Sequence, residues 1–466
     1  MAFTNFYIDQ AAGASNLNAG STSANASGSS AAAFTYAGGT FVRATGVFTP
    51  ASGDPAADGV TVGTYASVYT TAGAVAATFV AQITARDATT ITVDITTLKW
   101  GVATSVSEAA GATTLKVSGA WASEVVLAAT GLGTFTAPVS TKINFTGNLA
   151  VAASRTISMD GAQTAPIWFS GYNTAPGDLD ADTTNALAKP VWTLGATFIL
   201  TTSGDYQVWS GLSVLGERSG PIWQMSGVSP IASRVRSENT SSNAAAIAFT
   251  STVVGLYLDS WFKCPTTATT TGVVNASVGS IWIRVTAEGG GIAGFNGANQ
   301  TNTYIECIGL NNTGAAFLNT TGSARLFSCT VYGATVDCVK WTGTPAAGAS
   351  VVGCLFSGLN GSTATTNGVN NASGTNTSAV MRAQNVYYNV TNPEVGFGDH
   401  PSISQHTDSN PIVTSATDMT PVSGSRARGA YLPPIVEAQT FYNYANRGAV
   451  QHADSGGFVG IVGDGA

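Results

Sequence analysis

Three short segments decide how this chain folds: Ile305-Glu306-Cys307, Phe327-Ser328-Cys329 and Val352-Gly353-Cys354. Their cysteines lie 22 and 25 residues apart, and each follows an apolar residue two places earlier. An interval of this size that recurs along a chain is typical of a solenoid, in which each coil buries one face against the next coil.

Related triplets continue on both sides at intervals of 22 to 31 residues: Trp209-Ser210-Gly211, Val235-Arg236-Ser237, Leu258-Asp259-Ser260, Ile283-Arg284-Val285 and Ala383-Gln384-Asn385. The first position is always apolar and the third is small or neutral. A period of two predicts a strand with positions one and three inward and position two outward. One such strand per coil predicts an all-β fold, a parallel β-helix. A leucine-rich repeat shares this interval, but the chain lacks its Leu-x-x-Leu-x-Leu pattern.

This register predicts two ladders of side chains. The inward ladder consists of Gly211, Ser237, Ser260, Val285, Cys307, Cys329, Cys354 and Asn385. The outward ladder alternates in charge and consists of Arg236, Asp259, Arg284 and Glu306. We interpret the outward ladder as register control by opposite charges, with a charged ligand groove as the alternative. The stacked thiols are interpreted as small buried hydrophobes in preference to a metal or redox site.

The opening of the chain carries a resemblance to a known family. Residues 6–13 read Phe-Tyr-Ile-Asp-Gln-Ala-Ala-Gly, and residues 16–22 read Asn-Leu-Asn-Ala-Gly-Ser-Thr. This resembles the first coil of right-handed parallel β-helix proteins of the pectate-lyase-like superfamily, which often begin with Tyr-Tyr-Val-Asp, a Gly-x-Asp-x-Asn loop and Gly-Thr. Ser15 replaces the loop aspartate, which weakens any metal role that the resemblance implies there.

Residues from about 36 to 135 do not keep the coil interval. Residues 79–84 and 90–95 alternate as strands around a short turn, which predicts an antiparallel hairpin. We therefore expect four regions: a first coil at 1–35, an inserted all-β subdomain or cap at 36–135, the main β-helix at 136–392, and capping loops with a Gly-rich tail at 393–466. An open solenoid end requires such caps.

The composition of the chain makes several classes of function improbable. Only 9% of the 466 residues are charged, with 18 Lys and Arg against 25 Asp and Glu, so nucleic-acid binding is not expected. No apolar run is long enough for a membrane span, and no signal peptide is recognisable at the start. The five cysteines are an odd number, which argues against a disulfide framework.

Few residues could form an active site or a metal site, and no catalytic residue is predicted. Asp259 and Glu306 would lie about 10 Å apart across two coils, with Arg284 between them to keep both ionised. Asp178, Asp180 and Asp182 alternate in a Gly-containing loop. They are the candidates for a Ca²⁺ site, with a solvated acidic loop as the other interpretation and no other cofactor expected.

The expected function is structural. A hydroxyl-rich solenoid with few charges resembles β-helical surface proteins of tailed bacteriophages, which implies a non-enzymatic virion protein, a capsid decoration or head spike made in the host cytoplasm. The alternatives are a tail spike or fibre that binds host polysaccharide, and a polysaccharide lyase or glycoside hydrolase. We also expect a homotrimer among other virion proteins, because Trp209, Trp261, Trp282 and Trp341 cannot all point inward.

Overall fold

The computed structural model describes residues 3–11, 13–22, 30–74, 77–127, 140–179, 189–268, 270–276, 279–297, 301–358, 364–375, 380–397 and 406–407. The chain divides into two compact units, residues 1–215 with 225–236, and residues 216–224 with 237–466. In the described residues the regular structure is β-strand apart from short 3-10 turns at Ala103–Ser105 and Glu124–Leu127. No helix in this part of the chain is long and apolar enough to cross a membrane. The predicted fold class, a parallel β-helix with an inserted antiparallel subdomain, is confirmed.

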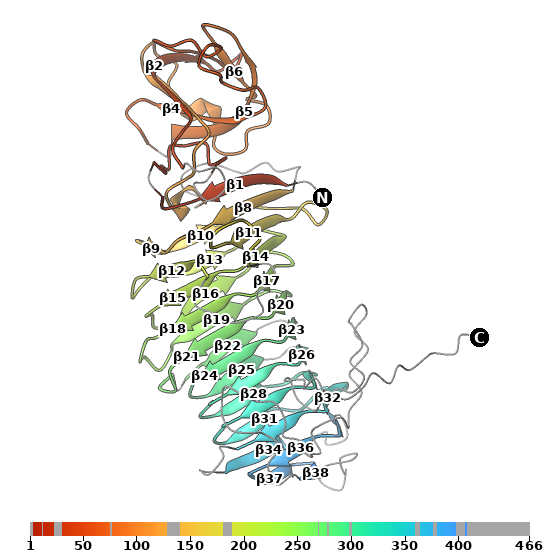
Figure 1. Cartoon of the computed structure of the whole chain (residues 1–466). Helices are drawn as coiled ribbons and strands as arrows, with labels where there is room; N and C mark the ends of the chain where they lie inside the picture. Colours follow the sequence, from red (N-terminus) through yellow and green to blue (C-terminus); the bar gives the residue numbers. More distant parts are fainter. Residues whose placement is uncertain are drawn as a thin grey trace, which may run out of the picture. The chain divides into compact units, whose positions relative to one another are not determined.

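The first unit contains parallel coils made of three short strands each (Figure 1). One sheet holds β1 (Thr4–Ile8), β8 (Thr141–Phe145), β11 (Ile167–Gly171), β14 (Gln207–Ser210) and β17 (Ile231–Ser233). The second holds β9 (Leu149–Val151), β12 (Val191–Leu194) and β15 (Ser213–Gly216), and the third holds β10 (Arg155–Ile157) and β13 (Leu200–Thr202).

The second unit continues the same pattern, and we name its sheets 1, 2 and 3. Sheet 1 holds β20 (Leu256–Leu258), β23 (Ile281–Ile283), β26 (Thr303–Ile305), β29 (Arg325–Phe327), β32 (Ala349–Val352) and β35 (Val380–Ala383). Sheet 2 holds β18 (Arg236–Asn239), β21 (Trp261–Cys264), β24 (Thr286–Gly289), β27 (Ile308–Leu310), β30 (Thr330–Tyr332), β33 (Leu355–Ser357), β36 (Val386–Tyr388) and β38 (His406–Thr407). Sheet 3 holds β16 (Pro221–Met225), β19 (Ile247–Ser251), β22 (Gly272–Ala276), β25 (Ala293–Gly297), β28 (Ala315–Asn319), β31 (Asp337–Trp341), β34 (Thr365–Asn371) and β37 (Val390–Val395).

The inserted subdomain is a closed antiparallel barrel in the first unit. Its strands, in barrel order, are β2 (Phe34–Val42), β3 (Val47–Thr49), β6 (Ile91–Val93), β5 (Thr78–Arg86), β4 (Tyr65–Thr70) and β7 (Thr113–Val117). The predicted hairpin corresponds to β5 and β6, which pair antiparallel. Strand β2 closes the barrel because it pairs with both β3 and β7, and its pairing with β7 has an irregularity between Tyr36 and Gly39.

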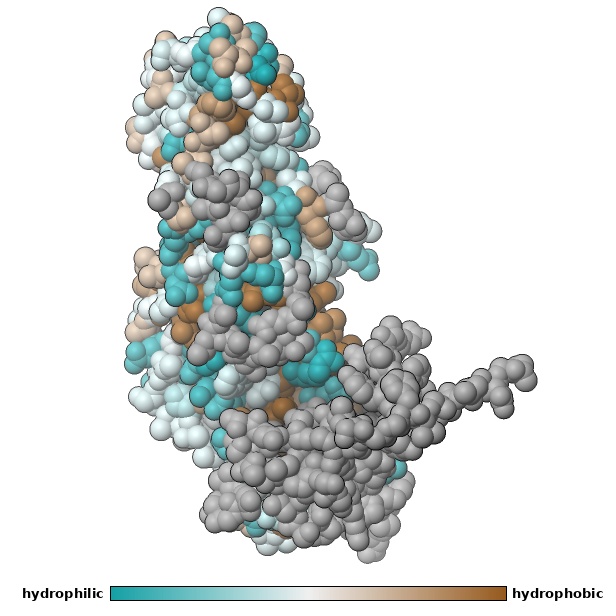
Figure 2. Space-filling view, in the orientation of Figure 1, coloured by the Kyte–Doolittle hydropathy of each residue, from teal (hydrophilic) through white to brown (hydrophobic). Residues whose placement is uncertain are grey.

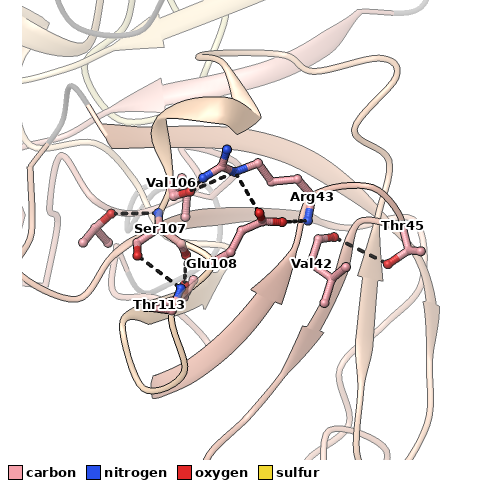
Figure 3. Close-up of polar contacts among 9 residues, drawn as sticks. Val42, Arg43, Thr45, Val106, Ser107, Glu108 and Thr113 are labelled. Atoms are coloured by element: carbon pink, nitrogen blue, oxygen red, sulfur yellow. Dashed lines mark hydrogen bonds and ion pairs between the residues drawn. The ribbon is translucent and has the colours of Figure 1, made fainter.

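A polar clamp ties the end of β2 to the segment before β7 (Figure 3). The guanidinium of Arg43 donates to the carbonyl oxygen of Val106 from Nε and Nη2, at 3.1 and 2.9 Å. Glu108 accepts the backbone N–H of Arg43 at 2.6 Å. The same two side chains therefore hold both the backbone and each other, and the barrel is closed by specific contacts as well as by its apolar core.

The repeated triplet is a corner between two strands and not a single strand. In the second unit, Leu258, Ile283 and Ile305 end successive strands of sheet 1 in register. The middle residue of each triplet then takes a left-handed conformation, with φ of 47° at Asp259 and 52° at Arg284, and the third residue leads into sheet 2. The prediction that position one points inward is wrong, because the preceding residue of each strand is the fully buried one and position one lies on the outward face.

Two predicted triplets of the first unit are out of register with the corners. The left-handed residues there are Gly211 and Arg234. Gly211 is thus the middle of a corner, and neither Arg236 nor Ser237 occupies its predicted position. The third positions of these corners are Leu212 and Val235, both fully buried. An apolar–polar–small alternation looks the same after a shift of two residues, so the pattern alone could not separate Arg234 from Arg236.

The tryptophans are placed differently from the prediction. Trp209, Trp282 and Trp341 are fully buried, whereas Trp261 is partly exposed on sheet 2. Trp282 stacks on Tyr257 of the preceding coil, with ring centroids 4.1 Å apart. Where a glycine faces an inward ring it makes room for that ring: a Cβ added to Gly368 would lie 2.4 Å from the ring of Tyr387. Of the four tryptophans on which the homotrimer prediction rested, only Trp261 therefore offers a partly exposed ring, and the homotrimer stays a prediction.

Candidate functional site

The corner positions of sheet 1 carry a strip of alternating charge in the second unit. Arg284 donates from Nε and Nη2 to the two carboxylate oxygens of Asp259, at 2.5 and 3.1 Å. Its Nη1 lies 4.0 Å from Oε2 of Glu306 on the next coil. A left-handed corner turns each of these side chains outward at the same place on its coil. The three residues therefore form an ion-paired strip along successive coils.

The titration of Glu306 differs from the prediction. Burial raises the pKa of Glu306, and the neighbouring Arg284 guanidinium lowers it by less, while the Asp259 charge raises it further. The loss of hydration thus outweighs the attraction of one shared cation, so Arg284 does not keep the pKa of Glu306 from rising. Glu306 has the raised pKa of a general acid, but its nearest charged neighbour is a cation and not a second carboxylate.

A second pairing between coils lies beside the strip, on the outward face of sheet 2. Lys263 and Glu288 are cross-strand partners, and Nζ lies 3.1 Å from Oε1. The same ammonium is 5.8 Å from the ring centroid of Trp261, which is partly exposed. Cross-strand pairs of opposite charge favour one register over its neighbours. An aromatic ring with polar groups at its edge is also a surface on which a ligand can stack.

The third positions of the corners share one bonding pattern. Ser260, Cys307 and Cys329 are buried and donate to the carbonyl oxygen of the first residue of their own triplet, at 2.6, 3.5 and 3.6 Å. Cys354 does the same at 3.5 Å, and Asn385 accepts the backbone N–H of Cys354 at 3.0 Å. Val285 is fully buried without such a group. Burial raises the pKa of Cys329 well above its usual value, which makes this thiol unreactive.

The acidic loop is only partly described. Asp178 lies in the described residues, whereas Asp180 and Asp182 lie outside them. The Asp178 carboxylate accepts backbone N–H groups from Asn173, Thr174 and Ala175, at 3.0, 2.6 and 3.1 Å. Burial opposes the charged form, but these hydrogen bonds lower the pKa of Asp178. In the described part of the chain, no group of three or more metal-binding side chains comes together.

The sequence did not predict a polar cluster on sheet 3. The Asp337 carboxylate, at the start of β31, is almost fully buried. Its Oδ1 accepts amide groups from Asn367 and Asn370 at 2.8 Å each, and its Oδ2 lies 3.1 Å from Nζ of Lys340. These residues come from two neighbouring coils. The sequence does not reveal this cluster because the number of residues between a strand of sheet 1 and the next strand of sheet 3 varies. The position of the triplet therefore does not predict where the strands of sheet 3 begin.

Comparisons with known proteins agree with the fold. No family model matches the chain, and no curated protein matches it. Among solved structures, the pectate lyase Pel9A has a TM-score of 0.44 at 10% identity, over 68% of this chain and 89% of that one. The PL6 family alginate lyase AlyGC has a TM-score of 0.27 at 10% identity, over 60% and 52%. The A-module of the Azotobacter vinelandii mannuronan C-5 epimerase AlgE4 has 0.24 at 9%, over 57% and 88%.

The parallel β-helix fold is shown by the strand order of the structure itself. The similarities to solved structures are too low in identity to carry an activity to this chain, and the bacteriophage resemblance finds no counterpart among them. What the chain does is therefore argued from its own residues.

Proposed function

We propose that this chain is a non-enzymatic structural protein of the bacteriophage particle surface, a capsid decoration or head-spike protein. The observation that carries the proposal is the use of outward charges in pairs between coils. Arg284 is shared by Asp259 and Glu306, and Lys263 is paired with Glu288. Paired charges hold coils in register and leave no adjacent pair of free carboxylates for hydrolysis on this strip. The low charge and hydroxyl-rich surface are consistent with a protein that lies packed among others.

A tail spike or fibre that binds host polysaccharide is the second candidate. Its support is the partly exposed indole of Trp261, which has the Lys263 ammonium over its ring, with the Glu288 carboxylate paired to that ammonium. Sugar rings pack their apolar faces on such rings while their hydroxyls bond to polar neighbours.

A polysaccharide lyase or glycoside hydrolase is the third candidate. The Asp337 cluster supports it, because it places a buried carboxylate beside the partly exposed ammonium of Lys340. Lys340 is the group that could move a proton there, and Asn367 and Asn370 hold the carboxylate in place.

The first experiment locates the protein. Antibody raised against the purified chain, followed by gold labelling of particles in the electron microscope, is expected to label the phage head. Labelling of the tail alone would favour the adhesin, and particles without label would overturn the virion proposal.

The second experiment tests chemistry. Purified protein is incubated with pectins, alginates and bacterial capsules, and products are followed by ultraviolet absorbance of unsaturated ends and by reducing ends. We expect no product. Activity that is lost in Asp337→Asn with the fold intact would establish the enzyme, and activity lost in Glu306→Gln would place it on the charged strip. Asp178→Asn serves as a control outside both clusters.

A further inference from the structure

An apolar strip lies on the outward face of sheet 1 in the second unit. It consists of the last residues of four successive strands and the first residues of the first two of them, all aliphatic or aromatic: Leu258, Ile283, Ile305 and Phe327, with Leu256 and Ile281. Ile281 is 45% exposed and the other five are partly exposed. In Figure 2, hydrophobic surface is visible on the flank where β20, β23 and β26 are labelled in Figure 1. A contiguous outward row of this kind marks an interaction surface.

The two borders of this strip carry opposite charge. On the corner side, Asp259, Arg284 and Glu306 together carry one net negative charge. On the other side, the strands begin with Leu256, Ile281, Thr303 and Arg325, which carry one positive charge. Arg325 is exposed, and its Nε donates to the neutral carbonyl oxygen of Gly348 at 3.3 Å. A surface that is basic on one border, acidic on the other and apolar between them is complementary to itself.

We propose that a second copy of this chain packs on the apolar strip through a two-fold axis parallel to the solenoid axis. Such an axis keeps equivalent coils at the same height and brings the corner border of one copy against the opposite border of its partner. Arg325 then lies one coil, about 4.8 Å along the axis, from the partner's Glu306. Two symmetric ion pairs flank an apolar contact between the strips. This inference does not depend on the proposed virion function.

The first test measures mass in solution. Gel filtration with light scattering at micromolar concentration is expected to give twice the 47.0 kDa of one chain. Ile281→Asp is expected to give the mass of one chain, because it puts a charge into the contact at a position that tolerates water. Val336→Asp is the matched control: Val336 is 41% exposed, lies outside sheet 1 and leaves the dimer intact. A wild-type monomer, or a dimer that survives Ile281→Asp, would overturn the proposal.

The second test separates the two-fold arrangement from other assemblies. Arg325→Glu is expected to weaken the dimer roughly tenfold, since each variant dimer has two repelling pairs. Glu306→Lys is expected to act in the same direction, and the double variant recovers most of the lost affinity. Circular dichroism confirms that each variant is folded. Additive losses in the double variant would overturn the pairing, and a mass of three chains would overturn the two-fold axis in favour of the predicted homotrimer.

Discussion

Different kinds of side chain fill the interior of the first coil and the interior of the last described coils. We call the first set the aromatic closure and the second set the charged closure. In the first unit, Phe6 of β1 points inward and packs on Tyr65, Trp100 and Trp121, with ring centroids 5.3, 4.7 and 5.5 Å away. In the second unit, β35 places Arg382 inward, at the register position that Val351 holds one coil earlier. Both Phe6 and Arg382 are almost fully buried.

The charged closure has its own partners. Arg382 forms an ion pair with Glu394, and the hydroxyl of Tyr387 donates to Oε1 of Glu394 at 3.0 Å. The guanidinium lies 3.8 Å above the ring of Phe397. A stack of apolar layers can thus end in an aromatic lid, which gains stability from buried area, or in a hydrogen-bonded ion pair. The ion pair gains little net stability, because both charges lose water.

The largest expected effect is at the aromatic closure. Trp121→Ala should lower the free energy of unfolding by about 4–5 kcal/mol, since it removes a buried ring and leaves a cavity. It also removes the hydrogen bond from Nε1 to the carbonyl oxygen of Asn18, 2.9 Å long. Urea unfolding of the full chain measures the change. Trp261→Ala, at a partly exposed indole, is the control and should cost much less; equal losses in the two variants would contradict the role of Trp121 as a lid.

The charged closure should respond to single and double substitutions in opposite ways. Glu394→Ala should lower stability by about 3 kcal/mol, because it leaves Arg382 buried without its carboxylate. Arg382→Leu combined with Glu394→Leu should restore most of the loss, since an apolar layer replaces the pair. Exchange of the β35 and β36 amides with deuterium locates the effect. If the double variant is no more stable than Glu394→Ala, the pair contributes net stability and our view of this closure fails.

The sequence predicts the coils and their contacts only where equivalent residues recur at a regular interval. The interval between Cys307, Cys329 and Cys354 was enough for the parallel coils, because equivalent residues lie on equivalent corners. The interval did not predict which side chains of the triplet point inward. A residue in the left-handed conformation, such as Glu306, reverses which of its neighbours points inward, and a polar side chain alone does not reveal that conformation. The contacts of Asp337 and Arg382 could not be predicted from the sequence for another reason. Apart from the local pair of Asp337 with Lys340, their polar contacts with Asn367, Asn370 and Glu394 join residues 12 to 33 positions apart, which only the coil geometry brings together.

The smallest expected effect is alkaline sensitivity at the charged closure. Burial raises the pKa of Tyr387 well above its usual value of 10.0, and the neighbouring Glu394 charge raises it further. The unfolded chain therefore releases this proton first. The free energy of unfolding contributed by Tyr387 is fully present below pH 10.0 and falls as the pH rises above it. Phe6, Trp100 and Trp121 do not titrate. Burial also raises the pKa of Tyr65 in the aromatic closure, but Tyr65 is partly exposed, so the loss there should be smaller.

Deuterium exchange measured at about pH 9 and about pH 11, on either side of the usual tyrosine pKa, compares the two closures directly after correction for the intrinsic pH dependence of exchange. Protection of β36 should fall with pH more steeply than protection of β1. Tyr387→Phe should remove this difference while leaving protection at the lower pH close to that of the wild type, apart from the loss of one hydrogen bond to Glu394. Because other buried thiols and phenols also release protons on unfolding, the whole second unit loses some stability in alkali. Only the alkaline loss of protection that Tyr387→Phe removes is due to the charged closure. If protection of β36 falls equally steeply with pH in the wild type and in Tyr387→Phe, Tyr387 takes no part in that loss.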